Sequence, residues 1–241
     1  MRDATQPLPR RLLAEFLGTG LLVAVVVGSG IAAQQLSPND IGIQLLENST
    51  ATVFGLAALI LLFGPVSGAH FNPVVSLADW FLGRRSGKGL TAPDVGAYAV
   101  AQVAGGIAGA LLANVMFDVS AGLSTKHRAS GGHLVGEIVA TAILVALIFA
   151  LVRTERGAIA APTVGAHIGA AYWFTSSTSF ANPAVTIGRI FSDTFAGIAP
   201  ASAPPFIAMQ LIGLAVGVAI TLALYPDAGG RADDVVVPHT H

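Results

Sequence analysis

Long apolar stretches alternate with short polar segments along the 241-residue chain. A helix that crosses the hydrocarbon core of a bilayer, about 30 Å thick, needs about 20 mainly apolar residues. Six stretches come close to this length, and we predict a transmembrane helix in each of them: residues 12–33, 49–66, 95–117, 134–152, 158–174 and 206–225. Residues 229–241 are polar and are predicted to form a tail.

Two further apolar segments are too short to cross a bilayer. Residues 72–82 follow the second predicted span and residues 182–191 follow the fifth, and each segment begins with Asn-Pro. Eleven helical residues cover only about 16 Å. Asn is a favoured helix N-cap and Pro suits the first turn, so we predict half-length helices that begin at Asn72 and Asn182. The irregular backbone before each would lie at membrane depth, where it survives only inside protein or beside water.

The two halves of the chain repeat these features. A glutamate lies inside the first span of each half, Glu15 in LAEFLGT and Glu137 in VGEIVAT. Each half has three crossings, an odd number, so the second copy must run inverted in the membrane. We therefore predict an all-α membrane protein with six transmembrane helices, two re-entrant half-helices and an inverted three-span repeat. The copies would be residues 1–120 and 121–228, with the Asn-Pro ends meeting near the midplane.

Composition and charge exclude several other classes of protein. Hydrophobic residues make up 54% of the chain and charged residues 10%, whereas soluble domains carry about 25% charged residues. The net charge of -1 offers no basic surface to a nucleic-acid partner. With no cysteine, disulfides and thiolate metal sites are excluded, and we expect neither a metal site nor a cofactor.

Lysine and arginine are unevenly distributed between the two ends of the predicted helix bundle. Positive residues in short loops stay on the cytoplasmic side of a membrane. The side of the N-terminus would carry Arg2, Arg10, Arg11, Arg84, Arg85, Lys88, Arg153, Arg156 and Arg231, and the opposite side Lys126, Arg128 and Arg189. We therefore expect both termini in the cytoplasm.

The segments SGAHFNPV at 67–74 and SFANPA at 179–184 resemble the paired signatures of the aquaporin and aquaglyceroporin (major intrinsic protein) channel family. The resemblance implies a pore in each protomer of a homotetramer in the bacterial inner membrane. It places the two signature triplets at the centre of the pore: Asn72, Pro73, Val74, Asn182, Pro183 and Ala184. The amides of Asn72 and Asn182 would donate hydrogen bonds to a passing solute, while Glu15 and Glu137 would support the irregular loops.

The family sets the narrowest point of its pore with four residues, which ungapped alignment from the asparagines places at Thr52, Ala170, Ser179 and Val185. Most members have an arginine where this chain has Val185. All four predicted filter residues are small or medium and uncharged, so we expect a wide pore. It would admit water and larger neutral solutes such as glycerol, urea or neutral arsenicals. The sequence around Val185 also resembles a bacterial subgroup associated with arsenic resistance.

Three further residues have alternative interpretations. His70 is expected to shape the cytoplasmic vestibule, by resemblance. His167 could line the pore and titrate near neutral pH, or could be a packing histidine, which we favour. Arg189 could place a positive charge at the pore mouth, or could pair with Asp193 at i, i+4, which we slightly favour.

Two other function classes fit the sequence less well than a passive channel. A secondary transporter is also built from inverted repeats with broken helices, but it needs a coupling-ion site, and the spans contain no carboxylate beyond Glu15 and Glu137. An intramembrane serine protease needs an activated nucleophile, and no Gly-x-Ser-Gly run presents one. We therefore predict a passive channel for small neutral solutes, with the transporter as the alternative, and no enzyme.

Overall fold

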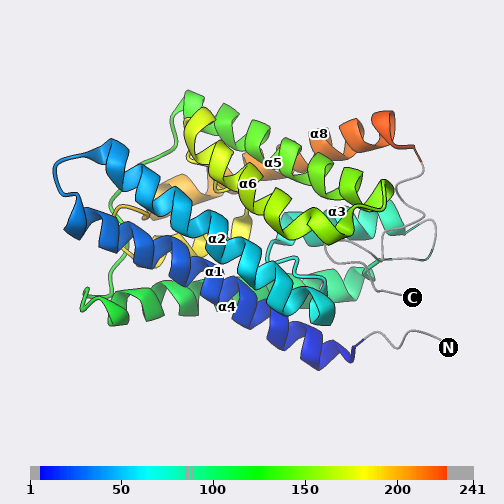
Figure 1. Ribbon diagram of the computed structural model, residues 1–241, viewed down its shortest axis with the longest axis horizontal. Helices are drawn as coiled ribbons and strands as arrows, with labels where there is room; N and C mark the ends of the chain where they lie inside the picture. Colours follow the sequence, from blue (N-terminus) through cyan, green and yellow to red (C-terminus); the bar gives the residue numbers. More distant parts are fainter. Residues whose placement is uncertain (1–5, 85–86, 88, 227–241) are drawn as a thin grey trace.

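The computed structural model describes residues 6–84, 87 and 89–226, and within these residues the fold is built of helices and loops without strands. The predicted tail at 229–241 lies outside the described residues, as do Arg2, Arg85, Lys88 and Arg231. The start of α1 and the end of α8 lie at the same end of an elongated helix bundle (Figure 1). Such an arrangement requires an even number of crossings.

Five helices are long and apolar enough to cross a membrane: α1 (Leu8–Leu36), α2 (Ile41–Ser67), α4 (Ala92–Met116), α5 (Gly131–Arg153) and α8 (Ala203–Leu224). Each contains most or all of a predicted span. Polar side chains cap the N-terminal ends of three of these helices. Asp40, Thr91 and Ser130 each accept a hydrogen bond from the backbone N–H three residues later, which caps α2, α4 and α5.

The fifth predicted span, 158–174, is shorter than expected. It forms α6 (Ala160–Phe174), which has 15 residues and follows a 3₁₀ turn at Gly157–Ile159. At about 1.5 Å per residue, α6 covers about 22 Å, less than a bilayer core. It is the sixth membrane helix of the fold, and it packs against α2 and α5.

The two Asn-Pro segments form short helices, as predicted. The first is α3 (Pro73–Gly83), with 11 residues. The second differs from the prediction of one helix to residue 191, because α7 (Pro183–Gly188) has only six residues and continues as a 3₁₀ turn, Arg189–Phe191. The break follows Gly188, where a side chain would collide with the carbonyl of Gly106 on α4.

Glycines let α1 and α4 approach so closely that their backbones touch. A Cβ atom built on Gly109 of α4 would lie 1.9 Å from the carbonyl oxygen of Gly20 on α1. One built on Gly105 would lie 2.2 Å from the carbonyl oxygen of Phe16. Small residues are enriched where membrane helices pack, because they permit this approach. The abundant glycines of the chain therefore position α1, which carries Glu15.

The contact at Gly109 yields a test of this packing. We expect Gly109→Ala to destabilise the protein by about 1–3 kcal/mol, because the methyl group overlaps backbone that cannot turn away. The matched control is Gly96→Ala on the same helix, where a Cβ meets nothing within 4 Å. Thermal unfolding in detergent should show a lower midpoint for Gly109→Ala and an unchanged or higher one for Gly96→Ala. Equal midpoints would contradict the backbone contact.

Candidate functional site

The N-terminal tips of α3 and α7 meet inside the bundle through their asparagines. Asn72 Nδ2 donates to the carbonyl of Ala181 at 2.8 Å, and Asn182 Nδ2 donates to the carbonyl of Phe71 at 2.7 Å. The side-chain oxygen of each asparagine caps its own half-helix and accepts from the N–H of Val74 or Ala184 at 3.0 and 2.9 Å. An amide nitrogen carries two hydrogens, so each asparagine retains one donor for a solute.

Glu15 of α1 holds the loop before α3. Its Oε1 accepts from the N–H of His70 at 3.0 Å and from Ser67 Oγ at 2.6 Å. Its Oε2 accepts from the N–H of Phe71 and from Gln102 Nε2, both at 2.7 Å. The carboxyl group is fully buried, and a buried carboxyl is tolerated only with such partners.

Glu137 of α5 makes the corresponding contacts with the loop before α7. Its Oε1 accepts from the N–H of Phe180 at 2.9 Å, and its Oε2 from the N–H of Ala181 at 2.9 Å. Gln210 Nε2 of α8 donates to the same Oε2 at 2.6 Å. Glu137 is also fully buried. Each glutamate thus satisfies two backbone N–H groups that have no helical partner.

Sequence reasoning missed the two glutamines of this network. Gln102 lies on α4 and also donates to Ser76 Oγ of α3 at 3.2 Å, while Gln210 lies on α8 and donates to Thr186 Oγ1 of α7 at 2.9 Å. Each glutamine therefore connects a glutamate to a half-helix. A signal was present, because each is an isolated polar residue inside the third predicted span of its half.

The loops held by the glutamates have an unusual backbone. Phe71 and Ala181 have φ values of 50° and 47°, and Ala69 and Ser179 both have φ values of 50°. Residues other than glycine rarely adopt positive φ, and each such residue costs about 1–3 kcal/mol. At Phe71 and Ala181 the N–H is bound to a glutamate and the C=O to the opposite asparagine. These paired contacts hold the strained conformation.

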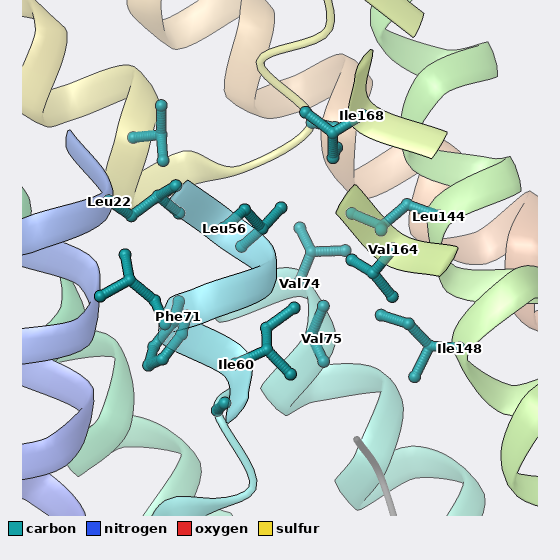
Figure 2. Close-up of a cluster of buried hydrophobic side chains, with 14 of the residues drawn as sticks. Leu22, Leu56, Ile60, Phe71, Val74, Val75, Leu144, Ile148, Val164 and Ile168 are labelled. Atoms are coloured by element: carbon teal, nitrogen blue, oxygen red, sulfur yellow. The ribbon is translucent and has the colours of Figure 1, made fainter. Parts of the chain in front are cut away.

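A cavity passes the two asparagines and has a mainly apolar wall. Figure 2 shows a cluster of buried apolar side chains from several helices. The labelled residues of this cluster that line the cavity are Leu22, Leu56, Ile60, Phe71, Val75, Leu144, Ile148, Val164 and Ile168. Polar lining comes from His70, Asn72, Asn182, Ser179, Thr52, Tyr172 and Arg189. A polar solute inside this cavity would therefore find hydrogen-bond partners at few positions.

Three of the four predicted filter positions, Thr52, Ser179 and Val185, line the cavity. The prediction for Ala170 is wrong, because this residue is exposed on the outside of α6. Ile168 and Tyr172 line the cavity instead, and Tyr172 lies with its hydroxyl 3.2 Å from Thr52 Oγ1. Side chains turn by about 100° per helical residue, so an error of two positions moves a side chain to the far side of the helix.

The two histidines lie in different surroundings. His70 lines the cavity, and its Nδ1 lies 3.0 Å from Ser76 Oγ. Its ring packs edge-to-face with the ring of Tyr98, and the two ring centres are 5.4 Å apart. His167 is half-buried between α6 and α5, with Nε2 3.2 Å from the carbonyl of Ala140. It is not among the cavity-lining residues, so the packing alternative describes it and the pore-lining alternative does not.

Arg189 does not pair with Asp193, and that alternative is wrong. Asp193 accepts from the N–H of Thr125 at 2.8 Å, and this bond is the main cause that lowers the pKa of its carboxyl group. Arg189 instead lines the cavity and donates through Nε to the carbonyl of Ala196. The pairing rule assumed a continuous helix, whereas α7 ends at Gly188.

Comparisons with known proteins agree with this architecture. A family model described as Major intrinsic protein matches residues 4–178. Aquaglyceroporin AqpS of Rhizobium meliloti (strain 1021) is 49% identical over 214 residues, which cover 88% of this chain and 89% of that protein. Aquaporin Z of Brucella melitensis biotype 1 is 33% identical over 205 residues, covering 77% and 86% respectively.

A solved structure shares the fold. The X-ray structure of the aquaglyceroporin from Plasmodium falciparum superimposes with a TM-score of 0.61, and the match covers 91% of this chain and 96% of that one. The sequences are 20% identical, so this likeness concerns the arrangement of helices.

The glutamate network can be tested by isosteric substitution. We expect Glu137→Gln to destabilise the protein by about 1–3 kcal/mol, because its NH₂ group faces a backbone or glutamine donor and leaves a buried group unpaired. Thermal unfolding in detergent measures the loss, and Glu15→Gln should behave alike. The control is Asp118→Asn, an exposed carboxyl-to-amide change in the loop after α4. An unfolding midpoint for Glu137→Gln as high as that of the control would refute the support role.

Proposed function

This chain belongs to the major intrinsic protein family, and we propose that it is a wide-pored member whose channel accepts neutral solutes larger than water. The family consists of passive channels, so the protein is a channel and not an enzyme. The observation that carries the wide pore is the cavity past Asn72 and Asn182, where Val185 places an apolar side chain beside the second signature.

The proposed conduction step is an exchange of hydrogen bonds. A solute that enters the apolar section loses most of its water and regains donors at the free amide hydrogens of Asn72 and Asn182. The opposed N-terminal ends of α3 and α7 add positive potential at the same place, which disfavours cations. A neutral solute with hydroxyl or carbonyl oxygens fits both conditions.

A secondary transporter is not favoured. Coupled transport needs a site for the coupling ion, usually made with carboxylates. No aspartate or glutamate of the described residues lines the cavity, and Glu15 and Glu137 are both committed to backbone N–H groups.

The proposed class of solute follows from the mainly apolar cavity wall with its few hydrogen-bonding side chains. The likeness to AqpS, an aquaglyceroporin, supports a range that includes glycerol. Neutral arsenous acid and its methylated forms also carry hydroxyl groups without a charge, and the sequence around Val185 resembles the arsenic-associated subgroup. We therefore include neutral arsenicals in the proposed range, together with urea.

We also propose that residues 1–120 and 121–228 are inverted repeats, which the matching networks of Glu15 and Glu137 support. The protein would assemble as a homotetramer in the bacterial inner membrane with both termini in the cytoplasm. The apolar outer faces of the helices support burial against lipid or a second copy, for example at Phe54, Leu61 and Val100, each at least 61% exposed.

The assembly has its own test. Native mass spectrometry of the detergent-solubilised protein should give four copies per particle, since the family resemblance implies a homotetramer. Chemical cross-linking in membranes should reach the same limit. A particle with one or two copies would contradict the tetramer without affecting the proposed pore, which lies within one chain.

The width of the pore is tested at position 185. We expect Val185→Arg to reduce the flux of glycerol and arsenous acid by at least about tenfold more than the flux of water, because a guanidinium narrows the cavity. Stopped-flow light scattering on proteoliposomes measures all the solutes on one preparation. Val185→Leu adds bulk with no charge and serves as the control. An equal loss for every solute would show that position 185 does not set the size limit.

A further inference from the structure

Arg189 lines the cavity and lies four residues after Val185, on the 3₁₀ turn that follows α7. The residue is 2% exposed. Its guanidinium carbon lies 3.5 Å from the centre of the Phe180 ring, and its Nε donates to the carbonyl of Ala196. Stacking and hydrogen bond together fix the plane of the guanidinium.

The two terminal nitrogens of the guanidinium have no hydrogen-bond acceptor among the residues that the structure describes. Within residues 6–84, 87 and 89–226, only Nε of Arg189 makes a hydrogen bond, and neither terminal nitrogen is among the fully enclosed atoms that lack one. Arg189 lines the cavity, and its two NH₂ groups take up no hydrogen-bond acceptor of the described residues. They provide up to four N–H donors.

The loop around Arg189 is built to hold positive charge. Three consecutive carbonyls, at residues 195–197, accept hydrogen bonds from Lys126, Arg189 and Arg128. Arg128 also faces the Phe180 ring, at 5.3 Å. Burial lowers the pKa of Arg128 to about 10, so this guanidinium stays protonated near neutral pH. Carbonyl oxygens, and no directly bonded carboxylate among the described residues, therefore accept the hydrogen bonds of these cations.

No carboxylate of the described residues forms a direct ion pair with Arg189, although the charge of Glu137 acts on it from a distance. The neighbouring Asp193 is bound to Thr125, and Glu137 is bound to the backbone and Gln210. Arg11 and Asp94 form an ion pair far along the chain from this loop, at 3.1 Å. Among the described residues that line the cavity, Arg189 is the only one with a side chain that is charged at neutral pH. The electric field of its positive charge therefore acts directly on a solute or ion inside the cavity.

We propose that Arg189 is the charge-selective residue of this pore. Its guanidinium repels cations at the cavity end, and its terminal NH₂ groups donate hydrogen bonds to the oxygens of the neutral solute. Since it lies beyond Val185, it adds charge without closing the wide section beside that residue. The inference rests on the proposed channel function, because it assigns a second selectivity to the same pore.

The experiment compares Arg189→Leu, Arg189→Gln and Arg189→Lys with the unmodified protein in proteoliposomes. Potassium flux and glycerol flux are measured on the same vesicles. The unmodified protein should pass glycerol with potassium flux at the lipid background. Leu and Gln variants should raise potassium flux by at least about tenfold, because the charge is lost in a low-dielectric passage. Lys keeps the charge and should keep potassium flux low. Leu removes the donors as well, so it should slow glycerol more than Gln does.

The control is Arg10→Leu, which removes an exposed arginine near the start of α1 and should change neither flux. Unchanged potassium flux in both the Leu and Gln variants would overturn the proposal, as would potassium conduction by the unmodified protein. Potassium conduction by the unmodified protein can be measured even if the Arg189 variants do not fold. Failure of the unmodified protein to pass glycerol would instead refute the channel for larger solutes, so the two failures are distinguishable.

Discussion

The structure depends on satisfying irregular backbone inside a membrane. A chain that leaves helical geometry in hydrocarbon exposes N–H and C=O groups, and each unpaired group costs several kcal/mol. Here the N–H groups of His70, Phe71, Phe180 and Ala181 are bound by two buried glutamates. The carbonyls of Phe71 and Ala181 are bound by the asparagines of the opposite half-helices. The tips can meet only because these contacts exist.

The same contacts produce the chemistry of the pore. Since each glutamate takes up the donors on one side of its loop, the asparagine amides and the half-helix ends are left to face the cavity. Gln102 and Gln210 connect each glutamate to a half-helix residue, Ser76 or Thr186. Beyond the second tip, Phe180 connects this centre to the outer end. Its N–H donates to Glu137, and its ring stacks on the guanidinium of Arg189. The same residue therefore contacts both the glutamate that holds the loop and the arginine proposed to select against cations.

The sequence predicts what depends on length, composition and capping. Long apolar stretches, Asn-Pro starts and isolated glutamates are local signals, and the structure contains the helices and re-entrant segments they indicate. The sequence does not predict features that depend on the face of a helix from which a side chain projects, or on the residue at which a helix ends. Ala170 was wrong because two residues turn a side chain to the opposite face of α6, and the Arg189–Asp193 pair was wrong because α7 ends at Gly188. Gln102 and Gln210 were missed because one polar residue in an apolar span has many possible partners.

The measurement that tests the central claim most directly is the dependence of solute flux on concentration and on ion gradients. In proteoliposomes the initial rate of glycerol entry should rise in proportion to the glycerol gradient, be equal in both directions, and stay the same when sodium and proton gradients are collapsed. A rate that saturates at low glycerol concentration and falls when an ion gradient is removed would contradict a passive pore through the two asparagines.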